Sequence, residues 1–322
     1  MVQGGQLTEA AVLSEPGSRL ARGYLICLTA TVIWSTTGIF IGYITQNFKM
    51  PPLLLAFWRD LIVSLTLLTA LALLGRSRLR VSTENLRFLA WYGLALTFLN
   101  TSWTISVVLN GAAVSTVLVY SSPAITALVG WRLYGERLDR AKITAIALSI
   151  LGAALVSGAY QPQVWQVNLI GVITGLLSGV AMALYSLMGK GAALRQINPW
   201  STLLYTFASA TLFLLFINLT SLGQAQGLAH SNLLWLGNAP LPWIILLILA
   251  IGPTIGGYGL YMVSLGYLQA SVANLIATLE PVFTAVLAYL LLAERLNGVQ
   301  ILGSLLIITG VALLRMYEGR RL

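Results

Sequence analysis

Long apolar segments separated by short polar stretches dominate the pattern along this chain. A helix that crosses about 30 Å of hydrocarbon needs roughly 20 mainly apolar residues. Dividing the chain at turn residues and charges predicts ten such helices, at 23–44, 53–74, 86–109, 111–132, 141–158, 168–189, 198–220, 242–265, 269–292 and 298–316. The pattern therefore predicts an all-α membrane protein with ten transmembrane helices.

The composition agrees with this prediction and removes several kinds of chemistry. Hydrophobic residues make up 58% of the chain and charged residues 8%, which is outside the range of soluble globular domains. Cys27 is the one cysteine in the sequence and has no histidine or cysteine at metal-ligand spacing. We expect no disulfide, no metal site and no cofactor.

The positive charges predict the orientation of the helices. The formal net charge is +9, but the charged residues cluster at the ends of the apolar segments. With a cytoplasmic N-terminus, only Lys49 and Arg295 of the 18 lysines and arginines lie on the far side, and Arg59 lies within a span. We expect a multi-pass inner-membrane protein with cytoplasmic tails at 1–22 and 317–322, and no nucleic-acid partner.

A repeat divides the chain into two similar halves. Shifting the sequence by 158 residues places Pro123 on Pro281 and the triplet Glu136–Leu138 on Glu294–Leu296 without a gap. Matches of leucine and alanine are common between membrane helices, whereas a proline and a Glu-Arg-Leu triplet at fixed separation are not. The repeat therefore indicates a duplication.

Each copy, 23–158 and 168–316, holds five predicted spans. An odd number of spans makes the second copy enter the membrane from the opposite side, which gives an inverted repeat. Inverted halves can open alternately to the two sides around a shared site near the membrane centre. A purely structural duplication, as in a scaffold, is the alternative.

Several motifs resemble one known family. The first span contains "ATVIWSTTGIF", the second contains "LLLAFWRDLIVS", and "GERL" and "AERL" close the fourth and ninth spans, which also hold the two prolines. These features resemble the drug/metabolite transporter superfamily, and within it the EamA-type exporters, over nearly all of 23–316. The resemblance implies secondary transport of a small molecule by alternating access. It leaves the substrate open, because such exporters carry amino acids, purine-like metabolites or drugs.

Glu280 is the main candidate for the transport chemistry. It lies near the middle of the ninth span, about 16 Å from its start at 1.5 Å per residue. A carboxylate at this depth has to be paired, hydrated or protonated. We predict that Glu280 couples transport to protons or balances a substrate ammonium group. A structural glutamate bonded to backbone loosened by Pro281 is the alternative, and Ser122 stands at the equivalent position of the first half.

Arg59 and Asp60 lie inside the second span. Adjacent helical side chains point about 100° apart, so we expect that they do not face one partner. Arg59 is predicted to bind a substrate carboxylate or to pair with Glu280. The alternatives are a structural pair or a side chain that extends to the interface. Lys190 ends the sixth span and is expected at the cytoplasmic interface.

The prolines and two glycines are candidates for movement. Pro123 and Pro281 each remove a helical hydrogen bond and are expected to bend their helices. Gly256 and Gly257 are expected to soften the eighth helix during gating. A static bend, or close helix packing, would need the same residues.

Aromatic and amide side chains within the spans are predicted to line the pathway for an amphipathic substrate. These residues are Trp34, Asn100, Trp103, Tyr120, Tyr185, Tyr258, Tyr261 and Asn274. Ordinary helix packing is the alternative for each. Glu136 and Glu294 are assigned to loop architecture, where each carboxylate accepts from the free amides that open the next helix.

The leading functional prediction is an exporter of amino acids or amphipathic drug-like compounds, with or without proton coupling. Its partners are the substrate, protons and lipids. A phosphate-binding loop of the Walker type is absent from the sequence. The one histidine, His230, falls in a loop, which disfavours a membrane enzyme. Transport of phosphorylated sugars or nucleotides, a lipid scramblase and a scaffold are the alternatives.

Overall fold

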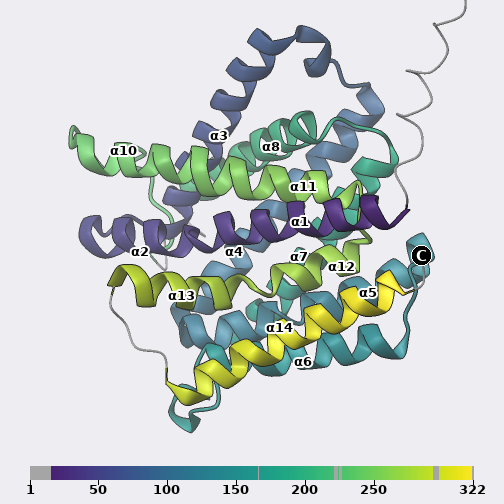
Figure 1. Ribbon diagram of the computed structural model, residues 1–322. Coiled ribbons are helices and arrows are strands. Elements are labelled where there is room, and N and C mark those ends of the chain that lie inside the picture. Colours follow the sequence, from purple (N-terminus) through teal and green to yellow (C-terminus); the bar gives the residue numbers. More distant parts are fainter. Residues whose placement is uncertain (1–15, 166, 221–223, 225–226, 293–296, 321–322) are drawn as a thin grey trace, which may run out of the picture.

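The protein is a bundle of helices in the part of the chain that the structure describes. The computed structural model covers 16–165, 167–220, 224, 227–292 and 297–320, and within these ranges it contains helices and no strands (Figure 1). The prediction of an all-α fold is therefore confirmed.

The helices of the first half follow the apolar segments closely. They are α1 (Pro16–Ser35), α2 (Thr37–Phe48), α3 (Pro52–Leu74), η1 (Arg76–Leu79), α4 (Thr83–Val119), α5 (Ser122–Tyr134), α6 (Arg140–Val156) and η2 (Pro162–Trp165). The helices of the second half are α7 (Leu169–Leu194), α8 (Pro199–Leu219), α10 (Pro240–Leu249), η3 (Ala250–Tyr258), α11 (Gly259–Leu265), α12 (Ala270–Ala277), α13 (Glu280–Leu292) and α14 (Gly298–Gly319).

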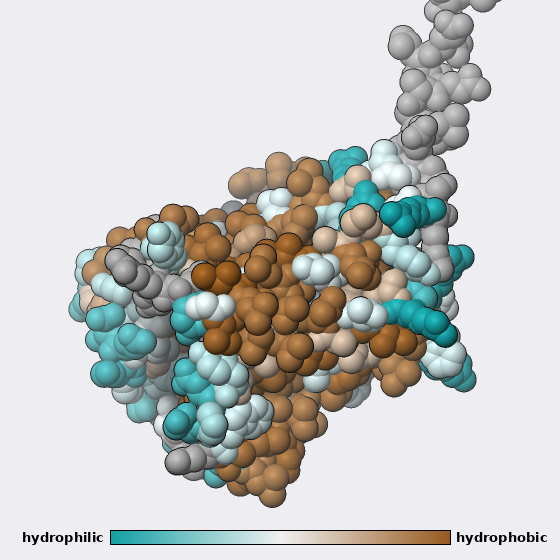
Figure 2. All heavy atoms as spheres, turned by 60° about the horizontal axis from the view of Figure 1, so that its bottom comes forward, coloured by the Kyte–Doolittle hydropathy of each residue, from teal (hydrophilic) through white to brown (hydrophobic). Residues whose placement is uncertain are grey.

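Eight helical segments of the described chain are long and apolar enough to cross a membrane. One of them, Thr83–Tyr134, covers 52 residues and contains two of the predicted spans. The fifth predicted span corresponds to α6, which has 17 residues. Figure 2 shows apolar side chains across the middle of one face, with polar side chains toward both ends. Ten crossings and inverted halves therefore stay predictions.

The chain reverses direction inside the longest segment. Gly111 has φ 77°, a left-handed conformation that suits glycine. The hydroxyls of Ser106 and Ser115 are 2.8 Å apart, whereas residues nine positions apart in a straight helix are separated by about 13 Å. The two parts of α4 therefore form a hairpin around Gly111.

Two helices break at equivalent places in the two halves. α4 ends at Val119 and α5 begins at Ser122, directly before Pro123. In the same way, α12 ends at Ala277 and α13 begins at Glu280, directly before Pro281. Proline lacks an amide hydrogen and clashes with the preceding turn, which explains an interruption at this point.

The eighth predicted span is also irregular. Its middle part, η3, is a π-helix that contains Pro253, Gly256 and Gly257. The first span is interrupted at Thr36, between α1 and α2. Movement at any of these breaks stays a prediction.

Close packing joins α6 of the first half to α14 of the second, which lie side by side (Figure 1). A Cβ atom added to Gly152 would lie 2.5 Å from the carbonyl oxygen of Gly303, and one added to Gly303 would lie 2.7 Å from that of Gly152. Here the two backbones touch directly, as small residues allow in membrane helices.

Candidate functional site

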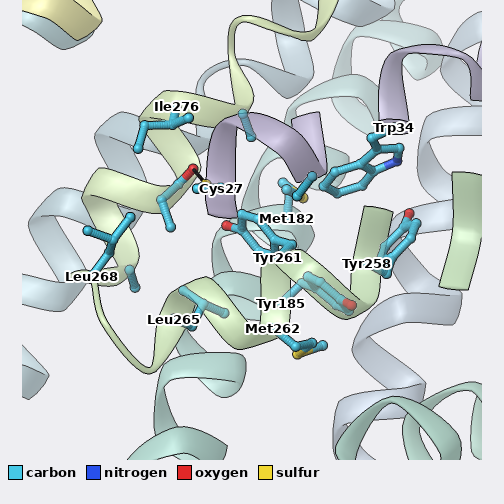
Figure 3. Packing of buried hydrophobic residues seen from close by; sticks show 14 of the residues in the cluster. Cys27, Trp34, Met182, Tyr185, Tyr258, Tyr261, Met262, Leu265, Leu268 and Ile276 are labelled. Carbon is cyan, nitrogen blue, oxygen red and sulfur yellow. Dashed lines mark hydrogen bonds between the residues drawn. The ribbon is translucent and has the colours of Figure 1, made fainter. Parts of the chain in front are cut away.

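An aromatic cluster occupies the centre of the bundle. The ring of Trp34 on α1 lies 4.3 Å from Tyr258 of η3 and 5.7 Å from Tyr261 of α11. Tyr185 of α7 lies 5.7 Å from Tyr258. All four side chains are buried and face one another (Figure 3). Four of the predicted lining residues therefore meet, and in this structure they fill the centre.

Two members of the cluster were missed by the sequence analysis. Tyr92 of α4 lies 4.8 Å from Tyr185, and Phe207 of α8 lies 5.3 Å from Tyr258. Both side chains are fully buried. Residue type alone does not distinguish an inward-facing aromatic from one that faces lipid, because the neighbouring positions are apolar in both cases.

Arg59 and Asp60 form an ion pair with each other inside α3. Arg59 Nε donates to Asp60 Oδ1 at 2.9 Å, and the two side chains are 6% and 0% exposed. The two side chains contact each other, and the expectation that they do not both face one further partner stays a prediction. Arg59 pairs with Asp60 and not with Glu280, as in the alternative interpretation.

Glu280 lies where the two broken helices meet. It opens α13, and its carboxyl group interacts with the hydroxyl of Tyr120, which closes α4. The helix N-terminus provides a partial positive charge that favours a carboxylate. Glu280 and Tyr120 are both half-buried residues.

Tyr258 connects the aromatic cluster to both charged sites. Its hydroxyl lies within electrostatic range of Arg59 and Asp60 on α3 and of Glu280 on α13. The candidate site therefore comprises the cluster, the ion pair and the carboxyl group of Glu280. This arrangement can contact apolar, charged and hydrogen-bonding parts of one small molecule. Among the described residues, no group of three acidic, histidine or cysteine side chains could hold a metal ion.

The two predicted amides differ in their surroundings. Asn274 of α12 accepts from Ser122 Oγ at 3.2 Å and donates to Thr126 Oγ1 at 2.8 Å, and its side chain is buried. It joins α12 to α5, and its predicted role as a lining residue stays a prediction. Asn100 and Trp103 of α4 are half-buried.

Glu136 holds together two helices from different halves. Between α5 and α6, its carboxylate accepts from the backbone amides of Ala270 and Ser271 at 2.7 and 3.2 Å, and also from the Ser271 hydroxyl. The sequence analysis expected the amides of the next helix along the chain. The carboxylate does bind free amides at a helix start, but that helix is α12. Glu294, its counterpart, lies outside the described residues.

Two lysines extend this polar contact. Lys142 Nζ donates to Gln269 Oε1 at 2.6 Å and to Ser271 Oγ at 3.0 Å. Lys190 Nζ donates to the carbonyl oxygens of Leu265 and Leu268 at 3.0 and 2.8 Å. Lys190 therefore bonds to the connection between α11 and α12, and it lies one turn before the end of α7 at Leu194.

We refer to Glu136, Lys142, Lys190, Gln269 and Ser271 as the polar clamp. The connection between α11 and α12 lies at the same end of the bundle as the start of α1 and the end of α14 (Figure 1). The clamp ties α6, α7 and the α5–α6 connection to the α11–α12 connection and to the start of α12. Charged groups thus join the two halves at this end of the bundle.

Comparison with known proteins identifies relatives over most of the chain. The profile of the EamA-like transporter family matches twice, at 21–158 and at 169–316. A probable amino-acid metabolite efflux pump of Escherichia coli is 26% identical over 298 residues, which cover 89% of this chain and 92% of that protein. An uncharacterized inner membrane transporter of Salmonella typhimurium is 25% identical, covering 93% of this chain and 97% of its own.

A solved structure supports the fold. It is a crystal structure of a protein that shares 18% identity and superposes with a TM-score of 0.72, over 93% of this chain and 99% of the other. At this identity the similarity shows the fold alone.

Proposed function

Because the chain belongs to the EamA-like transporter family, we propose that it exports small amphipathic metabolites, amino acids among them, by alternating access across the inner membrane. Membership of this family identifies the chain as a membrane transporter. Export of amino-acid metabolites is named for the relative in Escherichia coli. The position of Glu280, a half-buried residue at the meeting point of two broken helices, is the observation that carries this proposal.

Ten crossings in two inverted halves are part of the proposal. The hairpin at Gly111 divides the segment Thr83–Tyr134 into two antiparallel parts, each long enough for one crossing. With α6 counted as a further crossing, each half has five. The equivalent breaks before Pro123 and Pro281 and the two matches to the family profile support the duplication. The cytoplasmic position of both termini follows from the positive charges.

Alternation requires that one end is closed while the other is open. The polar clamp bonds the start of α12 to α6 and to the α5–α6 connection, and the aromatic cluster is buried. Glu280, Tyr120 and Thr284 are only half-buried. We therefore propose a state in which the clamp end is closed and Glu280 is reached from the opposite end.

The alternative substrates fit less well. Binding of a phosphorylated sugar or a nucleotide needs free cationic groups. Within the described residues, Asp60 balances the charge of Arg59, which leaves that pair without the net positive charge that a phosphate needs, and Lys142 and Lys190 are bonded within the clamp. A lipid scramblase or a scaffold makes no use of a carboxyl group at membrane depth.

Flux into proteoliposomes tests the proposed function. We expect the proteoliposomes to take up at least one labelled amino acid faster than protein-free vesicles do. Uptake should be faster still when the vesicles are preloaded with the same unlabelled amino acid, because a carrier changes back to its outward-open state faster with substrate bound. A pH gradient across the vesicle distinguishes proton coupling from facilitated diffusion. Movement of labelled lipid without flux of any metabolite would identify a scramblase, and no movement of either would identify a scaffold.

A further inference from the structure

The ion pair of α3 has incomplete hydrogen bonds. Asp60 Oδ2 is buried and makes no hydrogen bond with any described residue, and Arg59 Nη2 makes an ion-pair contact of 2.9 Å with Asp60 Oδ1 but no well-aligned hydrogen bond. A buried polar atom that lacks its full set of hydrogen bonds is unfavourable, and such atoms in native proteins need an explanation. Ionisable residues at membrane depth are commonly part of a substrate pathway.

The incompletely bonded donor and the free acceptor lie next to each other. Arg59 Nη2 is 2.9 Å from Asp60 Oδ1, and Oδ2 is bonded to the same carbon as Oδ1. An α-amino acid carries its ammonium and carboxylate groups on one carbon, so it presents the complementary pair at a similar spacing. We infer that Arg59 and Asp60 bind the head group of an amino-acid substrate. Arg59 Nη2 donates to its carboxylate, and Asp60 Oδ2 accepts from its ammonium group.

Charge balance favours a zwitterion over a singly charged ligand. The Arg59–Asp60 pair has no net charge, so a zwitterion leaves the site neutral. A lone phosphate, carboxylate or amine would add an uncompensated charge within the membrane, where charges are costly. This argument selects amino acids from the wider class in the proposed function, on which the inference rests.

The surroundings of the pair favour an amino acid with an apolar side chain. The charge of Arg59 acts on the hydroxyls of Tyr258 and Tyr185, which places the pair beside the aromatic cluster. The Tyr185 hydroxyl interacts with that of Tyr92 within the cluster. Rings of this kind provide apolar contact area for a substrate side chain. Because the pair is covered in this structure, the ligand reaches it when the cluster or the clamp opens.

Three ligands with the same aromatic side chain test the inference. Phenylalanine carries both charges, 2-phenylethylamine lacks the carboxylate, and 3-phenylpropanoate lacks the ammonium group. We expect the purified protein to bind phenylalanine about tenfold or more tightly than either analogue, since each analogue loses a charge-assisted hydrogen bond. Thermal stabilisation by each ligand gives the affinities.

Variants of Arg59 and Asp60 test which charged group of the ligand each side chain binds. Asp60→Asn is expected to remove the preference for phenylalanine over 3-phenylpropanoate, and Arg59→Gln the preference over 2-phenylethylamine. Either change leaves a buried charge unpaired, so the double variant Arg59→Gln with Asp60→Asn is also needed. It keeps the shape of the pair without its charges and is expected to bind the three ligands alike.

Ser64→Ala is the matched control. Ser64 lies one turn from Asp60 and bonds to its backbone carbonyl at 2.7 Å, so its loss should leave the ratios unchanged. The inference is overturned if the double variant keeps the preference for phenylalanine. It is also overturned if none of the twenty amino acids binds while another metabolite is transported, a result that leaves the proposed function intact. Absence of any metabolite transport would overturn both.

Discussion

Replacing Glu136 with alanine is expected to lower the free energy of unfolding by about 3–5 kcal/mol, the range for breaking a buried charged network. The carboxylate is buried and accepts from three donors at the start of α12. Its removal leaves the amides of Ala270 and Ser271 without that partner and removes one of the three negative charges that act on Lys142. Denaturant unfolding in mixed micelles measures the loss.

Glu84→Ala is the matched control for this change. The side chain of Glu84 is 84% exposed and lies 3.3 Å from Arg195, and exposed ion pairs of this kind contribute about 0–1 kcal/mol. Equal losses in the two variants would show that the bonds between Glu136 and α12 are not important for stability. Glu136→Gln, which keeps an acceptor oxygen without the charge, should fall between the two.

Replacing Glu280 with glutamine is expected to abolish the stimulation of transport by a pH gradient. The expected reduction in gradient-driven flux is at least about tenfold, because proton transfer by a positioned side chain accelerates reactions in enzymes by about 10²–10⁴-fold. Glutamine has almost the same shape and keeps the interaction with Tyr120, but it cannot bind or release a proton. Exchange of substrate without a gradient should continue. Flux into proteoliposomes with and without the gradient measures both quantities.

Glu318→Gln serves as the control for Glu280. Glu318 also bonds to a tyrosine, accepting from Tyr24 at 2.8 Å, but it lies near the end of α14, at the clamp end of the bundle. Gradient-driven flux should survive its replacement. If the Glu280 variant keeps the full response to the gradient, Glu280 has no role in proton coupling, and the alternative of a structural glutamate gains support.

The positions of the helices could be predicted from the sequence because the physical signals are strong. Apolar length sets where a helix can cross, and Pro123 and Pro281 mark the sites where α4 and α12 give way to new helices. The all-α fold follows from these signals. The number of membrane crossings was harder to predict. α6 has only 17 residues, and the turn at Gly111 joins two predicted spans into one helical segment.

The candidate site could be predicted only in part. Membrane helices carry apolar residues on all sides, so the sequence did not show which side of α4 faces inward, and Tyr92 was missed. Contacts between side chains of different helices could not be predicted from the sequence either. The bonds of Asn274 to Ser122 and Thr126 could not be read from the sequence, and Glu136 reaches α12 from a distant part of the chain. Such contacts depend on how the helices pack.

One cysteine placed beside Glu280 tests alternating access most directly. Cys27 is the one cysteine of the chain and is buried. A Cys27→Ala variant therefore contains no thiol that a maleimide could label. Thr284→Cys places a thiol one turn from Glu280, where Thr284 bonds to the carbonyl of Ser35. The account predicts that, without substrate, a membrane-impermeant maleimide labels this thiol only from the side opposite the clamp. When substrate is added, a fraction of the molecules is also labelled from the clamp side, and this fraction depends on the substrate. Labelling from one side under every condition, or from both sides at once, would contradict it.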